Sequence, residues 1–257
     1  MKKNAIRFAL FLCGVLFSLY GFAAAVVETA TGTVRVGASA AAAAVVSPGQ
    51  RLQAGSMVVT GPKSQAILRF DDGQIMILHE QTEFRVAEYS FIKDEPGKDR
   101  FSFELLKGAL RSITALVTQR TPKAYLIRTP QATIGIRGTD YMLAIVNPLY
   151  FSVLGGTIDV ANVAGPAAFT GGSTGIVANA NALASSLAAS SLPAAVTSAF
   201  SQLAAVPIAA AGAAGATGAA AGGISPAAIA IGAAVAAGAA AAAGGGGGGG
   251  GSTTGTR

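Results

Sequence analysis

The sequence has few of the residues that build metal centres, disulfides and catalytic triads. Its 257 residues include one cysteine, one histidine and no tryptophan. Zinc and iron centres use several Cys or His ligands, so a multi-ligand site of that kind is excluded. A histidine-based triad could be built only around His79. This composition argues against an enzyme, and we expect no catalytic residue, no metal ion and no cofactor.

Charged residues are also scarce, at 12% of the sequence against about 25% in a typical soluble domain. The scarcity is local, because from Val160 onward the one charged residue is Arg257, and Ala, Gly and Ser dominate. The hydrophobic fraction of 51% therefore describes an alanine-rich tail rather than a large core. An ordinary packed domain is expected only in the charge-bearing part, up to about residue 163.

Residues 1–25 have the pattern of a secretory signal peptide: Lys2, Lys3 and Arg7, an apolar run, and three alanines as a cleavage site. Cleavage after residue 25 would remove the single cysteine and lower the formal net charge from +6 to +3. We therefore expect an exported protein of the periplasm or cell envelope, without disulfides and with no nucleic-acid partner. An uncleaved anchor is the alternative, because residues 8–25 are nearly long enough to span a bilayer.

Residues 26–163 contain short runs rich in β-branched and aromatic residues, each closed by a turn signal, and this pattern predicts an all-β domain. Asp72-Gly73 lies between two such runs and predicts a hairpin with a type I′ turn. The runs are 33–36, 65–70, 74–78, 84–89, 100–105, 125–128, 139–146 and 150–154.

An internal repeat indicates how these strands are arranged. Residues 103–110 align without gaps on residues 151–158, and both read aromatic-x-apolar-Leu-x-Gly-x-apolar. Each copy would be a strand, a glycine corner at Gly108 or Gly156, and a second strand. The segment that starts at Gly32 repeats the second half of this unit. Repeated units of this kind favour a β-solenoid-like fold, and a distorted sandwich of similar hairpins is the alternative.

Five segments, in this order, resemble the FecR domain, which is the exported part of bacterial FecR-type regulators and of standalone envelope proteins. Ser56 stands where the family pattern usually has Asp, and Arg137-Gly138-Thr139 lies in the most specific segment. The five segments are 49–61, 66–73, 103–110, 125–133 and 134–141.

We interpret the motif residues of this resemblance as structural. Thr129-Pro130 is expected to end a strand, and Gly138 is expected to form a bulge or corner. Arg137 could contact a ligand, but we favour a role in tying the chain across that corner, with Asp71 or Asp140 as its acidic partner. The complete set is Asp72, Gly73, Gly108, Thr129, Pro130, Arg137, Gly138 and Thr139.

Two further groups of residues are weaker candidates. His79 with Glu80 and Glu83 could suggest a metal or acid–base cluster, but we expect an exposed loop histidine. Five basic residues without an intervening acid could attract an acidic partner if they shared one face, and a solvent-facing row on alternating strands is the simpler interpretation. These five are Lys107, Arg111, Arg120, Lys123 and Arg128.

The tail divides into an Ala/Ser-rich region, 164–205, and an Ala/Gly low-complexity region, 206–257. A helix is expected over 182–203, with a stripe that could dock on the β domain or on a partner; Pro193 interrupts it. Possible membrane association is assigned to 226–243, although alanine burial contributes little. The stripe is Leu183, Leu187, Val196, Phe200 and Leu203.

The resemblance implies a non-catalytic function. In the family's regulators, a cytoplasmic anti-sigma region and one membrane span precede the FecR domain, which receives a signal from a TonB-dependent iron-uptake receptor. Only about seven residues precede the apolar segment here, so we expect a standalone form without the anti-sigma region. We expect a protein-interaction or signalling module that binds an envelope protein or a cell-wall component. The alternatives are a structural or surface-displayed protein anchored through its tail and, as a distant third, a hydrolase.

Overall fold

The computed structural model of the chain places residues 24–114 and 121–207. Most of the expected signal peptide and the whole segment 226–243 lie outside these described residues, so both remain predictions. Within the described residues, no helix is both long enough and apolar enough to cross a membrane. In the described part of the chain, the helical elements are α3 (Ala194–Ala205) and three short 3-10 turns, η2 (Pro96–Lys98), η3 (Pro122–Ala124) and η4 (Ala189–Ser191).

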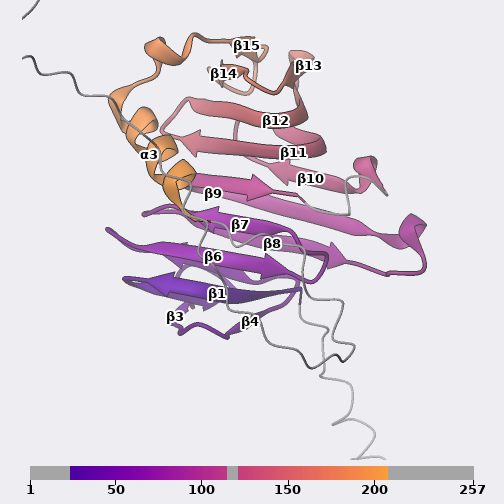
Figure 1. The fold of residues 1–257 in the computed structure, drawn as a ribbon, viewed down its shortest axis with the longest axis vertical. Coiled ribbons are helices and arrows are strands. Elements are labelled where there is room, and N and C mark those ends of the chain that lie inside the picture. Colours follow the sequence, from indigo (N-terminus) through magenta and orange to yellow (C-terminus); the bar gives the residue numbers. More distant parts are fainter. Residues whose placement is uncertain (1–23, 115–120, 208–257) are drawn as a thin grey trace, which may run out of the picture. The chain divides into compact units, whose positions relative to one another are not determined.

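The strands form one hydrogen-bonded sheet that folds into two layers, stacked from β1 to β14 in Figure 1. Layer 1 contains β1 (Ala25–Thr31), β4 (Arg51–Leu52), β6 (Gln65–Phe70), β7 (Ile75–Leu78), β14 (Thr174–Val177) and β15 (Ser185–Ser186). Layer 2 contains β2 (Val34–Gly37), β3 (Ala44–Val45), β5 (Met57–Thr60), β8 (Glu83–Ser90), β10 (Tyr125–Arg128) and β13 (Gly165–Thr170).

Three long strands run through both layers and join them: β9 (Arg100–Ile113), β11 (Thr133–Ile145) and β12 (Leu149–Asn162). The first half of β9 pairs with β8 and, in parallel, with β10, whereas its second half pairs with β7 and β11. The two halves of β12 similarly pair with β14 and with β13. The all-β expectation is confirmed.

Each long strand bends at a glycine with positive φ, as the internal repeat predicts for Gly108 and Gly156 and the motif residues predict for Gly138. Gly108 has φ +85°, Gly138 φ +58° and Gly156 φ +77°, and Gly32 (φ +72°) connects β1 to β2 in the same way. A Cβ added at Gly156 would lie 1.8 Å from the carbonyl oxygen of Gly138. Glycine is therefore required at position 156, both because φ is positive there and because the neighbouring strand β11 approaches closely.

The corners do not all lie on one side of the stack. In layer 1, Ile145 of β11 lies opposite Gly108 of β9, while Asp140 of β11 lies opposite Ile113. The corner of β9 is therefore at one end of the paired strands and the corner of β11 is at the other. The chain does not wind continuously in one direction, and the two layers pack face to face as in a distorted sandwich.

The core lies between the layers and is rich in aromatic residues. Phe70 of layer 1 contacts Phe103 of layer 2 edge-on, with ring centroids 5.2 Å apart. Phe151 and Phe169 meet at 4.6 Å near the far end of the stack. All four side chains are buried. Such pairs add specific geometry to the apolar burial that drives the packing.

The sheet continues past residue 163, where the composition predicted the end of the organised domain. β13 pairs with β12 from Thr157 to Asn162, and β14 pairs with the other half of the same strand. Phe169 and Val177 supply the buried side chains of these two strands. The charge-poor composition did not reveal these two strands, because small residues at outward-facing positions give little alternation between hydrophobic and polar residues.

Only the second half of the expected helix, 182–203, is helical. Leu192 has extended backbone angles, and Pro193 occupies the N-cap position of α3. Proline disfavours helical geometry in the residue before it, so the helix starts after Pro193. Val196, Phe200 and Leu203 are buried against Ile75, Ile77 and Met142 of layer 1, so this part of the stripe docks on the β domain. Leu183 remains 52% exposed.

Candidate functional site

The motif residues around β10 and β11 form turns, in keeping with a structural role. β10 ends at Arg128, immediately before Thr129-Pro130. The Thr129 hydroxyl donates to the carbonyl of Ala132 and accepts the Ala132 N–H, which closes a tight turn into β11. Thr139, which is buried, follows the Gly138 corner and donates its backbone N–H to the Thr114 hydroxyl. The Thr129 contacts fix the turn from β10 into β11 within layer 2, and the Thr139 contact fixes β11 where it crosses into layer 1.

Asp72 and Gly73 lie in the predicted hairpin between β6 and β7, but the turn differs from type I′. Only Gly73 has positive φ (+87°), and the Gly73 N–H donates to the carbonyl of Phe70. The Asp72 carboxylate is 3% exposed and accepts hydrogen bonds from the Tyr89 hydroxyl and the Gln74 N–H, both at 3.2 Å. Burial raises the pKa of Asp72 to about 6, although these hydrogen bonds act in the opposite direction.

A polar cluster that the sequence did not suggest lies inside the core. Gln74 Nε2 donates to the Tyr125 hydroxyl at 2.6 Å and to the Ser112 hydroxyl at 3.0 Å. The hydroxyls of Tyr125 and Tyr141 are 3.3 Å apart. Burial raises the pKa of both tyrosines, that of Tyr141 to about 12. Both phenols therefore stay protonated near neutral pH, and the cluster works as a hydrogen-bonded link between the layers.

The weaker candidates are dispersed by the fold. His79 is engaged by helix α3, with its Nε2 3.0 Å from Gln202 Oε1, and Glu80 accepts the backbone N–H of Lys63. Within residues 24–114 and 121–207, no group of three or more His, Cys, Asp or Glu side chains could hold a metal ion.

The basic row does not form one face. Arg111 lies on the outer face of layer 1, where it pairs with Asp140 at 2.7 Å and donates to carbonyls at the end of α3. Arg128 lies in layer 2 and donates to the Ser102 hydroxyl at 2.7 Å. Arg120 lies outside the described residues. The interpretation as one row is therefore wrong for Arg111 and Arg128, because their strands belong to different layers.

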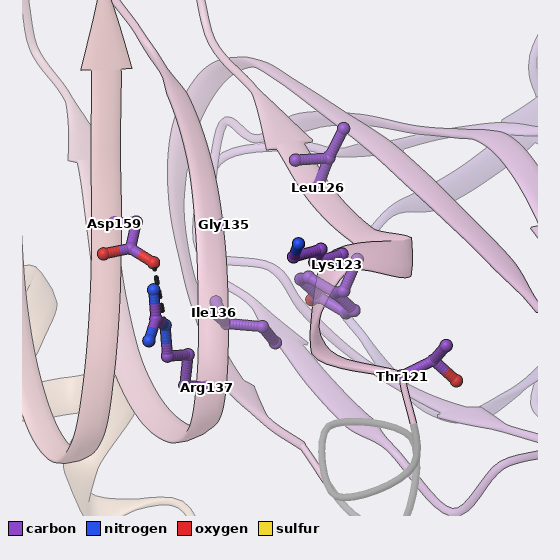
Figure 2. Close-up of a pocket in the computed structure, with 8 residues that line it drawn as sticks. Thr121, Lys123, Leu126, Gly135, Ile136, Arg137 and Asp159 are labelled. Carbon is purple, nitrogen blue, oxygen red and sulfur yellow. Dashed lines mark hydrogen bonds and ion pairs between the residues drawn. The ribbon is translucent and has the colours of Figure 1, made fainter. Parts of the chain in front are cut away.

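Arg137 pairs with neither of the two acids expected for it. Its Nε lies 3.0 Å from Asp159 Oδ2 on β12, as Figure 2 shows, and its side chain is 69% exposed. Asp140 is occupied by Arg111, and Asp71 belongs to the β6–β7 turn. The prediction failed because the bend at Gly138 places Asp140 in layer 1, whereas Arg137 remains in layer 2.

Arg137 and Asp159 form one wall of a cavity of about 570 Å³ on the outer face of layer 2. Lys123, Thr121 and Leu126 stand on the opposite side, and Ile136 lies between the two sides in Figure 2. The cavity opens where the β10–β11 ladder ends, at Leu126 and Gly135, while β11 continues to pair with β12 through Arg137. We take this cavity as the candidate site for a ligand.

The fold and this cavity define a class of protein. It is a two-layer β scaffold in which a helix packs on one outer face and the other outer face carries a cavity open to solvent. Residues 56–159 match a family model described as FecR protein, so this stretch is a FecR domain. The match includes the cavity residues and all the motif residues named above. It starts at Ser56, whose hydroxyl accepts the Gln53 N–H at 3.0 Å, a role that the Asp of the family pattern could also fill.

Two crystal structures of a proposed anti-sigma factor from Parabacteroides distasonis are similar to this chain. They are 16% and 17% identical to it, with TM-scores of 0.42 and 0.41. Both matches cover 51% of this chain, and they span 58% of the length of that protein. Comparison with curated proteins finds no match.

Proposed function

We propose that this chain is an exported, non-catalytic protein of the bacterial cell envelope, whose FecR domain binds another envelope protein. The observation that carries the proposal is the contrast between the two outer faces. Helix α3 covers part of layer 1, whereas within the described residues no α-helix covers the outer face of layer 2, which carries the exposed Arg137–Asp159 pair and the 570 Å³ cavity. A rigid scaffold with a preformed, solvent-facing cavity is suited to binding a partner.

A non-catalytic role is supported by the chemistry of the cavity. Among the described residues that line it, the carboxylate is Asp159, which is ion-paired with Arg137. Glycoside hydrolysis uses a pair of carboxylates at the scissile bond. The buried polar groups are no better suited, because Gln74, Ser112 and the two tyrosines hydrogen-bond to one another inside the core.

The proposal is tested by in-cell crosslinking. The full chain with an affinity tag is expressed in its own host, crosslinked and recovered, with an unrelated exported protein carrying the same tag as control. We expect one envelope protein to be enriched over the control. Equal recovery from both baits would contradict the proposal.

A further inference from the structure

The cavity on layer 2 continues into a second hollow, and together they form one groove. The second hollow, of about 240 Å³, shares Thr121, Lys123 and Leu126 with the first and extends over β8 and β9. We call the combined surface the outer groove. It crosses β8, β9, β10, β11 and β12, whose spacing of about 4.8 Å gives a length of roughly 19 Å. That length matches five or six residues of an extended peptide, at about 3.3 Å per residue.

The outer groove carries an excess of positive charge. Its bases are Arg100, Lys123, Arg128 and Arg137, and its acids are Glu88 and Asp159.

These bases keep donors available for a ligand. Arg128 donates to the neutral Ser102 hydroxyl, and Arg100 donates to backbone carbonyls. The Nε of Arg137 donates to Asp159, so the terminal nitrogens of its guanidinium are available to a ligand. Lys123 is exposed and has no acidic partner among the described residues. An anionic ligand would therefore meet charges that the protein itself has not neutralised.

The floor of the groove is small and apolar. A Cβ added at Gly135 would find its nearest neighbour at 3.9 Å, on Asp159, so a side chain there would make an ordinary van der Waals contact without a clash. Leu126 lies directly opposite Gly135 in the β10–β11 ladder and is partly exposed. An apolar side chain of a ligand can lie over these two residues, between the cations.

The backbone also favours a peptide. Beyond Gly135, β10 no longer pairs with β11, while β12 still does. Successive residues of a strand direct their N–H and C=O to alternate sides, so either Ile136 or Arg137 points its groups toward the groove. An extended peptide that crosses the strands can hydrogen-bond to these groups. The aromatic residues of the groove, Phe101 and Tyr125, are buried and offer no exposed ring for a sugar to stack on.

We propose that the outer groove binds an extended acidic peptide segment of the partner, with carboxylates at Lys123 and Arg137 and an apolar side chain over Gly135 and Leu126. This inference rests on the proposed function and specifies the partner's chemistry.

The test measures binding of a fluorescein-labelled peptide of alternating Asp and Leu to the purified full chain by fluorescence anisotropy. Peptides with Asn or Lys in place of Asp are the ligand controls. We expect the Asp peptide to bind more tightly than the Asn peptide, with the difference decreasing as salt rises. Gly135→Leu fills the floor, and Lys123→Glu with Arg137→Glu reverses the charge; each change should weaken binding about tenfold or more.

Arg69→Glu is the matched control variant, because Arg69 forms a similar ion pair with Glu28 on layer 1, at 2.9 Å. It should bind the Asp peptide as the unmodified chain does. Equal binding of the Asp and Asn peptides, or unchanged affinity in the groove variants, would overturn the inference. If in-cell crosslinking still recovers the partner with Gly135→Leu, the groove is wrong while the proposed function stands; if it recovers no partner from the unmodified chain, the proposed function itself fails.

Discussion

Layer 1 and layer 2 are built from the same alternating strands, but their outward-facing residues differ. On layer 1 these include Ile75, Ile77 and Met142, which are buried under α3. On layer 2 they include exposed Arg137, so the corresponding surface stays in water. The difference shows that α3 covers an apolar part of layer 1, while the outer face of layer 2 stays exposed to solvent at Arg137.

The strongest way to break this arrangement is to remove the connection between the layers. Gly156→Val puts a branched side chain where a Cβ alone would lie 1.8 Å from the Gly138 carbonyl oxygen, at φ +77°. We expect a loss of more than about 4 kcal/mol, enough to unfold the domain. Circular dichroism and urea unfolding measure it. Gly135→Ala on layer 2 is the control and should remain folded, because the added Cβ would lie no closer than 3.9 Å to a neighbouring atom. A folded Gly156→Val protein of normal stability would contradict the close approach at this corner.

The second prediction compares the two outer faces directly. Leu203→Ala removes a fully buried side chain between α3 and layer 1 and should lower the free energy of unfolding by about 2–5 kcal/mol. Leu126→Ala, on the outer face of layer 2, should cost less than about 1 kcal/mol. Urea denaturation of both variants gives the values. Equal losses would mean that the two faces are covered to the same extent.

The third prediction concerns Asp72, which joins the β6–β7 turn of layer 1 to Tyr89 of layer 2. Because its pKa is raised from 3.8 to about 6 in the folded state, its contribution to stability is full below pH 4 and is lost as the pH rises through 6. The loss is roughly 3 kcal/mol, at about 1.4 kcal/mol per pKa unit.

Asp72→Asn keeps an acceptor oxygen for Gln74 and Tyr89 but cannot ionise. Its free energy of unfolding should therefore change less between pH 4 and pH 7 than that of the unmodified chain. Urea titrations at both pH values measure the difference. Parallel pH profiles would show that Asp72 titrates normally.

The smallest expected effects come from two Arg–Asp pairs on opposite faces. Arg111 is 12% exposed beside α3, whereas Arg137 is 69% exposed on layer 2. Asp140→Asn should cost about 2 kcal/mol, because it leaves a mostly buried guanidinium without its counter-charge. Asp159→Asn should cost about 0.5 kcal/mol or less, as for exposed pairs generally. Thermal unfolding of the two variants tests the order, and the reverse order would contradict the assignment of the faces.

Local patterns predicted much of this fold. The repeated Gly108 and Gly156 units predicted the corners, because positive φ is a property of single residues that the sequence displays. The helix expected over 182–203 was predicted too long, because α3 begins only after Pro193. Strand β6 was predicted at its observed bounds, since Gln65–Phe70 alternates cleanly between buried and half-buried positions.

Contacts between distant segments could not be predicted in the same way. Gln74 and Tyr125 are 51 residues apart in sequence, and only the packing of the two layers brings them together. The partner of Arg137 was misassigned because a bend in β11 separates residues three positions apart into different layers. The sequence did not predict the outer groove for a related reason. The groove lies where the pairing between β10 and β11 ends, and this depends on the fold.

Site-specific photo-crosslinking in living cells tests the central claim most directly. A photoreactive phenylalanine derivative is placed at Leu126 in the outer groove and, in a second chain, at Glu28 on the outer face of layer 1, where the native side chain is 41% exposed. The account predicts one discrete crosslinked product from position 126, absent from position 28 and lost when Gly135→Leu is added. A product of equal yield from position 28, or one at position 126 that persists with Gly135→Leu, would contradict it.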